Sequence, residues 1–205
     1  MQHTLQTEVF GVRLRPVRME DAAFIVWLRN QDYVKGRVGD SATDVSSQQA
    51  WLETYFMREG DYYFIVETPG GVPVGTYGIY DVANGTAESG RWIIRPGVPA
   101  AVASGMAMFD TAFNTLALRE VRGRTVASNQ AVLSINRKFG FRQVRVEPAG
   151  QIIGGQAIDM VHFILTAAAW PNTRERLVPL ARLAANQVLE WEREHSKSNF
   201  FPGAG

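Results

Sequence analysis

Apolar and polar side chains alternate, or aromatic and β-branched residues gather, in several segments of the chain, and both patterns are typical of strands. Asn84-Gly85 separates two of these segments and is a strong hairpin signal. The short connections around it predict an antiparallel meander. A Gly-rich loop at 150–155 predicts a further hairpin. The predicted strands are residues 9–15, which end at Pro16, then 62–67, 74–82, 87–94, 120–126, 141–146 and 158–166.

Other segments repeat apolar residues every three or four positions, as amphipathic helices do. The clearest of them spans about 102–116, and its apolar face predicts packing in the core. Ser46 or Ser47 is expected to cap an earlier helix, because a serine hydroxyl accepts a hydrogen bond from the first helical turn. The other predicted helices carry Phe24, Ile25, Trp27 and Leu28, then Trp51, Leu52, Tyr55 and Phe56, and then span 131–138 and 173–195.

This order of elements predicts an α+β domain with a mixed, mostly antiparallel sheet that is flanked by helices. The only parallel pair expected is formed by the two strands on either side of the long helix. The pattern changes after Trp170 and Pro171. We therefore expect one domain over residues 1–170, followed by an added amphipathic helix and a flexible tail over residues 171–205.

Composition excludes several classes of function. The 205 residues suit one domain with an appendage. The formal net charge of +1 gives no electrostatic reason to expect nucleic acid or a membrane surface as a partner. Cysteine is absent and the three histidines lie far apart, so no metal site is expected. No signal peptide and no apolar run of about 18 residues is seen, so a cytoplasmic protein is expected.

Several segments occur in an informative order. They are LRPVRMED at 14–21, WLRN at 27–30, GRWIIRPG at 90–97, FDTAF at 109–113 and NQAVLSINRKFGF at 129–141. Together they resemble the GNAT superfamily of N-acetyltransferases, in a branch that includes ribosomal-protein N-terminal acetyltransferases and acetyltransferases of amino sugars on nucleotide carriers. The resemblance covers residues 9 to about 170. It implies a GNAT-like fold and the use of acetyl-CoA.

The resemblance also implies that acetyl-CoA binds where the strand at 87–94 ends. Backbone N–H groups near Ile93 and Ile94 are expected to face the pantetheine arm and the thioester, because the family's fourth strand bulges away from the fifth. The following loop leads into a helix N-terminus, which binds phosphate through free N–H groups and the helix dipole. The residues expected at the pyrophosphate are Gly97, Val98, Ala100, Ala101 and Val102.

Two features depart from the family pattern. The loop RPGVPAAVASG at 95–105 holds no clear Arg/Gln-x-x-Gly-x-Gly/Ala motif. Asn136 stands where many members carry a tyrosine acid, and an amide has no titratable proton but can donate a hydrogen bond to the sulfur or the cofactor. Asn129 follows a predicted strand, and it either bonds the pantetheine arm or caps the next helix.

Glu88 is the candidate general base, because several family members place a carboxylate at the start of this strand. Partial burial would bring its pKa nearer to the working pH. The alternative is a solvated carboxylate that pairs with a neighbour such as Arg91, and Asp81 is the next candidate for the base. The expected substrate contacts, which come from the first two helices, their connecting loop and a neighbouring strand, are Trp27, Arg29, Asn30, Tyr33, Tyr77 and Tyr80.

An amino sugar on a nucleotide carrier is the expected acceptor, because aromatic rings stack on sugars and Asn and Arg bind hydroxyls. Arg29, or Lys35 and Arg37 in the following loop, would meet the diphosphate. Gly36 and Gly39 suit a loop that orders on binding. Two alternatives stay open: the N-terminal amine of a protein or peptide, and a non-catalytic module of the same fold. The expected partner is therefore a small-molecule amine, and a homodimer is compatible with the sequence.

Overall fold

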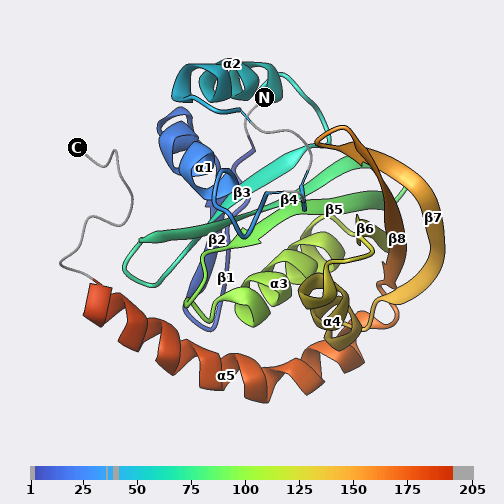
Figure 1. Ribbon diagram of the computed structural model, residues 1–205. Coiled ribbons are helices and arrows are strands. Elements are labelled where there is room, and N and C mark those ends of the chain that lie inside the picture. The colour runs from blue at the N-terminus through green and yellow to red at the C-terminus, as the bar shows by residue number, and fades with distance from the viewer. Residues whose placement is uncertain (1–2, 36, 39–41, 196–205) are drawn as a thin grey trace.

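The computed structural model describes residues 3–35, 37–38 and 42–195. They form one sheet with helices on both faces (Figure 1). The strands are β1 (Thr7–Val9), β2 (Val12–Pro16), β3 (Tyr62–Glu67), β4 (Pro73–Ala83), β5 (Thr86–Ile94), β6 (Glu120–Val126), β7 (Arg142–Ile153) and β8 (Gln156–Thr166). The helices are α1 (Ala22–Arg29), α2 (Val45–Tyr55), α3 (Ala101–Asp110), α4 (Gln130–Lys138) and α5 (Trp170–His195), with a 3-10 turn over Met19–Asp21 and a π-helical turn over Thr111–Thr115.

The eight strands are ordered β1-β2-β3-β4-β5-β6-β8-β7 across the sheet. Neighbouring strands are antiparallel except β5 and β6, which are parallel and are connected through α3. The helices α1 and α2 cover one face, while α3, α4 and α5 cover the other (Figure 1). The predicted α+β fold, with its single parallel pair, is confirmed.

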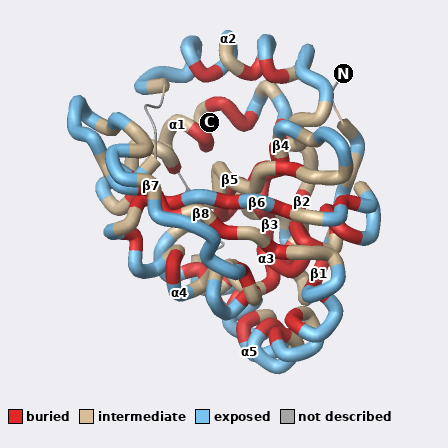
Figure 2. Tube along the Cα trace, turned by 90° about the vertical axis from the view of Figure 1, so that its right-hand side faces the viewer, coloured by how far each residue is buried: buried red, intermediate tan, exposed pale blue. Residues whose placement is uncertain are grey.

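Two apolar clusters hold these layers together. The larger one lies under α3 and α5 and contains Phe109, Phe139 and Trp170. The smaller one lies under α1 and α2 and contains Ile25 and Leu52. Figure 2 shows the buried residues along the strands and on the helix faces that meet the sheet. In the described ranges, no helix is both long and apolar enough to cross a bilayer.

The first predicted strand is a hairpin instead of one extended segment. Val9 pairs with Val12, and Phe10 and Gly11 between them have φ values of 49° and 77°. Two consecutive residues with positive φ make the tight turn whose twist matches an antiparallel pair. The alternation of apolar and polar residues that predicted the strand runs only from Val12 to Arg15, so it gave no indication of the reversal just before it.

The last hairpin is longer than predicted. Its turn is confined to Gly154 and Gly155, with φ values of 58° and 77°. Because two glycines suffice for the reversal, residues 151–153 pair with 156–158 instead of forming a loop. The glycine-rich run at 150–155 therefore predicted a longer loop than the one the chain forms.

Two helix boundaries also differ from the prediction. Asp44 caps α2 in place of Ser46 or Ser47, because its Oδ1 accepts a hydrogen bond from the Ser47 N–H at 2.8 Å. Both serine hydroxyls donate to the same carboxylate. The long helix predicted at 102–116 ends as an α-helix at Asp110 and continues as the π-helical turn.

The C-terminal helix α5 packs on the α3 side of the sheet (Figure 1) and is fastened at both ends. At its start, Asp110 of α3 accepts hydrogen bonds from Trp170 Nε1 at 2.9 Å and Arg174 Nε at 2.8 Å. At its end, Glu192 accepts from the Thr68 hydroxyl at 2.5 Å and from a backbone N–H of the β3–β4 turn at 3.0 Å. The predicted tail, NFFPGAG, lies outside the described residues.

Candidate active site

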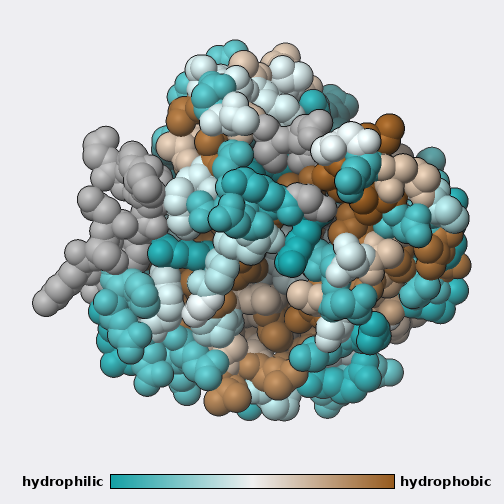
Figure 3. Space-filling model, in the orientation of Figure 1, coloured by the Kyte–Doolittle hydropathy of each residue, from teal (hydrophilic) through white to brown (hydrophobic). Residues whose placement is uncertain are grey.

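The central cleft opens where β5 and β6 separate. The two strands pair only from Thr86 with Glu120 to Ser89 with Gly123. Beyond that point a cavity of about 310 Å³ lies between them, lined by Gly90 to Ile94 of β5, by Gly123 to Thr125 of β6, and by residues of α4 and of the loop after α1. Figure 3 shows the surface hollowed near its middle, between that loop and α4, with apolar side chains beside the hollow.

A bulge in β5 causes this separation. Gly78 pairs with Gly90 but Thr76 pairs with Ile93, so β5 holds one extra residue between the two pairs. Arg91 lies within that extra stretch with a φ of 54°, and its carbonyl accepts a hydrogen bond from the Thr76 hydroxyl at 2.7 Å. A bulge bends its strand and interrupts pairing. The bulge expected from the family resemblance is therefore present in this chain.

The pairing of β4 with β5 shows which of the two backbone N–H groups expected in the cleft, those of Ile93 and Ile94, points into it. The Arg95 N–H donates to the carbonyl of Val74 at 2.8 Å. Because N–H directions alternate along a strand, the Ile93 N–H faces β4 and the Ile94 N–H faces the opposite side, where β6 has separated. The register thus assigns the open donor to Ile94 and places Ile93 in the ladder.

The loop after β5 presents an uncapped helix N-terminus. Gly97 has a φ of 82°, and the Val98 N–H donates to the Arg95 carbonyl at 3.3 Å to form a turn. Ala100 occupies the N-cap position of α3 without a side-chain hydrogen bond. The first N–H groups of α3 therefore lack the side-chain acceptor that Ser, Thr, Asp or Asn would supply, which suits an anionic ligand.

The residues predicted at the pyrophosphate differ in whether their side chains, or only their backbone groups, are accessible to a ligand. Val98 and Ala100 have buried side chains that belong to the core, so only their backbone is available to a ligand. Ala101 and Val102 are half-buried. None of these, nor Gly97, lines the central cleft itself.

Both predicted asparagines line the cleft from α4. Asn129 caps α4, since its side-chain oxygen accepts from the Val132 N–H at 3.3 Å. The capping role is confirmed, and the contact with pantetheine stays a prediction. Asn136 lies about two helical turns further along α4, where its amide can donate into the cleft.

Glu88 lies in a second cavity, next to the central cleft. This cavity shares Gly123 and Arg124 with the cleft and is also lined by Tyr80, Asp81 and His162. Its remaining lining residues are Glu88, Arg122, Val144, Arg145, Phe163 and Ile164.

The Glu88 carboxylate is half-buried and forms no ion pair with any residue of the described ranges. Burial raises its pKa above the ordinary glutamate value, while the charges of Arg124 and Arg122 act in the opposite direction. The alternative pairing with Arg91 is wrong, because that guanidinium binds both oxygens of Asp61, at 2.5 and 2.9 Å. Asp81 lines the same cavity but is exposed.

The predicted substrate residues do not form one cluster. Tyr33 lines the central cleft and Tyr80 lies beside Glu88. Arg29 lines a third cavity, between α1 and α2. Asn30 is a structural residue, because its amide donates to the carbonyls of Val26 and Ala42.

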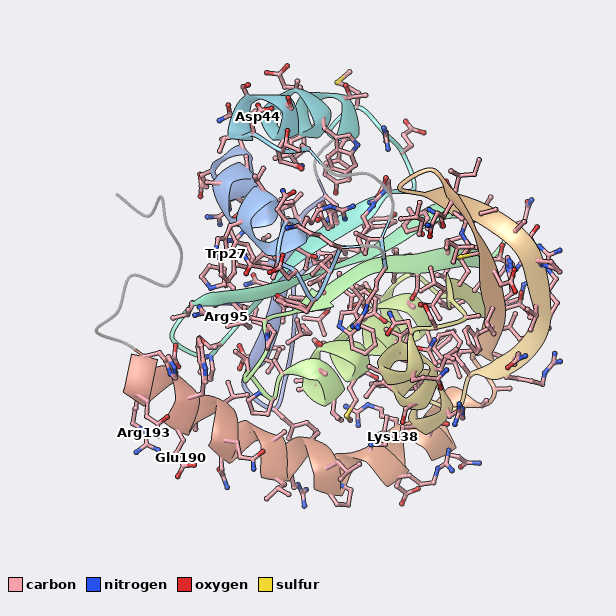
Figure 4. All side chains as sticks on the ribbon, viewed as in Figure 1. Trp27, Asp44, Arg95, Lys138, Glu190 and Arg193 are labelled. Carbon is pink, nitrogen blue, oxygen red and sulfur yellow. The ribbon has the colours of Figure 1, made fainter. Side chains whose placement is uncertain are left out.

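The remaining aromatic candidates pack against protein groups. Trp27 stacks on Phe24 with 6.0 Å between ring centroids, and the Arg95 guanidinium lies 5.3 Å from its ring. Figure 4 shows Trp27 and Arg95 side by side at the edge of the sheet. Tyr77 is buried and stacks on Trp92 at 4.8 Å, and it lines the central cleft together with Tyr33.

The loop after α1 contributes less charge than expected. Arg37 lines the cleft, whereas Lys35 pairs with Asp32 at 2.8 Å on the surface. Gly36 and Gly39 lie outside the described residues.

Arg124 is a residue that sequence reasoning missed. It is exposed, lines both cavities, and forms no ion pair within the part of the chain that the structure describes. It follows Gly123, the last β6 residue that pairs with β5. In the sequence it is one of two arginines in an alternating strand, and nothing there distinguishes it from a solvated charge.

Over the part of the chain that the structure describes, no three or more His, Asp or Glu side chains lie close enough together to hold a metal ion.

Comparisons with known proteins agree with this geometry. A family profile described as "Acetyltransferase (GNAT) domain" matches residues 12–142. A GCN5-related N-acetyltransferase from Brucella melitensis superposes with a TM-score of 0.75 at 17% identity, covering 87% of this chain and 86% of that one. No curated protein matches this chain by sequence.

Two further solved structures carry information on substrates or cofactors. Apo FdhC, a nucleotide-linked sugar GNAT, superposes with a TM-score of 0.71 at 25% identity, covering 88% of this chain and 98% of that one. RimJ from Mycobacterium smegmatis, in complex with CoA-disulfide, superposes with a TM-score of 0.73 at 23% identity, covering 87% and 94%.

Proposed function

This chain belongs to the GNAT acetyltransferase family, and from that membership we propose that it acetylates the amine of an amino sugar carried on a nucleotide. It is an N-acetyltransferase that uses acetyl-CoA. The observation that carries the proposal is the cleft between β5 and β6. The Ile94 N–H faces this cleft, and the adjoining cavity contains the Glu88 carboxylate, which forms no ion pair with any described residue. That arrangement suits a donor and an acceptor that meet at one gap in the sheet.

Acetyl-CoA supplies an acetyl thioester, and the residues of the chain supply the rest of the reaction. Glu88 accepts the proton that the acceptor amine loses, so that the nitrogen lone pair is available for attack. The Ile94 N–H stabilises the negative charge that develops on the acetyl oxygen. The amide of Asn136 donates a hydrogen bond toward the departing sulfur, and the final proton comes from solvent because an amide cannot titrate.

Acceptor recognition is assigned to the cavity that contains Glu88. Tyr80 offers an aromatic ring there, and Arg124 offers a guanidinium with no carboxylate partner among the described residues. A nucleotide diphosphate would form charge-assisted hydrogen bonds with Arg124. The likeness to FdhC, whose printed description is a nucleotide-linked sugar GNAT, supports this acceptor class.

A panel of amines tests this assignment. It contains nucleotide-linked amino sugars, free amino sugars, aminoglycosides and N-terminal peptides, and CoA thiol release is the readout. We expect preferential turnover of a nucleotide-linked sugar. Turnover of peptides with inert nucleotide-linked sugars would replace the proposal by an N-terminal acetyltransferase, and binding of acetyl-CoA without turnover of any amine would favour the non-catalytic module.

Arg124→Met provides a matched test of the diphosphate contact. We expect the KM of a nucleotide-linked acceptor to rise about 10- to 100-fold, since a hydrogen bond to a charged group contributes roughly 1.5–3 kcal/mol. The KM of the corresponding free amino sugar and that of acetyl-CoA should change less than threefold. An equal rise in the KM of the free amino sugar would show that Arg124 does not bind the diphosphate.

Ala101→Glu tests the pyrophosphate site at the start of α3. A carboxylate in the first turn stabilises a helix by about 0.3–1 kcal/mol, but it repels an anionic ligand at the same N–H groups. The apo protein should keep or raise its Tm, while the Kd of acetyl-CoA measured by calorimetry rises at least tenfold. Ala101→Gln is the neutral control, and an unchanged Kd in the Glu variant would place the pyrophosphate elsewhere.

A further inference from the structure

The C-terminal helix α5 makes a contact next to the proposed acetyl-CoA loop that the function described above does not use. The Arg95 guanidinium lies 5.3 Å from the ring of Trp27 in α1 and 5.4 Å from the ring of Trp191 in α5. Figure 4 shows Arg95 between Trp27 and the end of α5 that carries Glu190 and Arg193. A cation over an indole face is an attractive and oriented contact.

Arg95 is also the residue that begins the turn into α3. Its N–H donates to Val74 at 2.8 Å and its carbonyl accepts from Val98 at 3.3 Å. The backbone of Arg95 therefore defines the path from β5 to the uncapped α3 N-terminus, while its side chain lies between helices from opposite faces of the sheet.

The end of α5 is itself well anchored. Trp191 is 8% exposed, and His195 stacks on it with 4.6 Å between ring centroids. The neighbouring Glu192 holds the β3–β4 turn through the Thr68 hydroxyl and the Gly70 N–H. A Cβ at position 70 would approach the Glu192 carboxylate to 2.3 Å, so a side chain there would require this carboxylate to move.

We propose that Trp191 is a positioning residue for acetyl-CoA: it fixes Arg95, and through Arg95 it fixes the turn that presents the α3 N-terminus to the pyrophosphate. Trp191 itself does not touch the ligand. This inference rests on the proposed acetyl-CoA site, and it adds α5 to the elements that determine donor affinity. Loss of Trp191 should therefore weaken the binding of acetyl-CoA without slowing acetyl transfer, because the turn contacts the pyrophosphate and not the reacting thioester.

The test compares Trp191→Ala, Trp191→Phe and Val188→Ala in the full chain. Val188 is 1% exposed on the same helix, so its truncation removes core packing without removing a ring from Arg95. Calorimetry gives the Kd of acetyl-CoA, and steady-state kinetics gives kcat and both KM values. We expect Trp191→Ala to raise the Kd and the acetyl-CoA KM about tenfold, with kcat and the acceptor KM within threefold of wild type.

The conservative variant decides between positioning and general destabilisation. Trp191→Phe keeps an aromatic face for Arg95 and should stay within threefold of wild type in Kd, and Val188→Ala should keep the wild-type Kd despite a lower Tm. An unchanged Kd in Trp191→Ala, or an equal rise in Val188→Ala, would overturn the inference while leaving the proposed function intact. Failure of the wild-type chain to bind acetyl-CoA would instead overturn the site on which both depend. If Trp191→Ala does not fold, Arg95→Met in its place should raise the Kd about tenfold, and an unchanged Kd there would also overturn the inference.

Discussion

Glu88→Gln is expected to lower kcat about 10²- to 10⁴-fold, which is the usual contribution of a general base. The amide keeps the size of the side chain but cannot accept the amine proton. Because Glu88 lies in the cavity next to the cleft and not at the α3 N-terminus, the Kd of acetyl-CoA should stay within threefold of wild type. Stopped-flow and steady-state measurements of CoA release, with calorimetry for binding, check both parts.

The pH profile gives an independent readout of the same residue. The carboxylate is the active form, so kcat/KM should rise as the pH increases through the pKa of Glu88. Burial raises that pKa, and the acidic limb should therefore lie above the ordinary glutamate value of about 4.3. In Glu88→Gln this limb should disappear, whereas Asp81→Asn, in the same cavity, should keep it. A limb that persists in the Gln variant and is lost in the Asn variant would assign the base to Asp81.

Trp170→Ala is expected to lower the free energy of unfolding by about 3–5 kcal/mol, the usual cost of truncating a buried aromatic residue. Trp170 is 2% exposed and packs on Phe109, Phe113 and Phe139. Its loss also removes the hydrogen bond from Nε1 to Asp110, which fastens the start of α5. Equilibrium denaturation in urea, with an unchanged m-value, measures the effect.

Leu183→Ala is the control on the same helix, because Leu183 is 62% exposed. Its effect should remain within about 0.5 kcal/mol, as is usual for surface positions. A loss below 1 kcal/mol in Trp170→Ala would mean that α5 does not unfold together with the sheet. It would then behave as an appendage that can be removed without loss of the core.

Short-range chemistry explains which elements the sequence predicted well. The strands at 62–67 and 120–126 coincide with β3 and β6, since their aromatic and β-branched residues act locally. Asn84 and Gly85 have φ values of 50° and 74°, as the hairpin requires. The turn at Phe10-Gly11 was missed because a bulky residue with positive φ carries no local signal of its own.

The residues of the candidate site also fall into those that the sequence predicted and those that depend on long-range contacts. The sequence placed Asn129, Asn136 and the Ile93–Ile94 segment at one cleft, because the family resemblance includes their order along the chain. It could not show that Arg91 is held by Asp61, thirty positions away, or that Arg29 faces a different cavity from Tyr33. Such pairings depend on strand register and on the bulge, neither of which is encoded near the residues concerned.

Hydrophobic periodicity was therefore enough to predict the fold class. The order of the motifs, through the resemblance to the family, predicted the family and acetyl-CoA as the donor, because that order is visible without knowledge of the contacts. Which groups meet across the sheet could be seen only once the elements were packed together. The one-residue bulge at Arg91 turns the Ile94 N–H into the cleft, the end of β5–β6 pairing brings Arg124 to both cavities, and α5 returns Trp191 to Arg95. Each of these depends on segments that are distant in the sequence, and its physical cause is the register and packing of elements that no local pattern specifies.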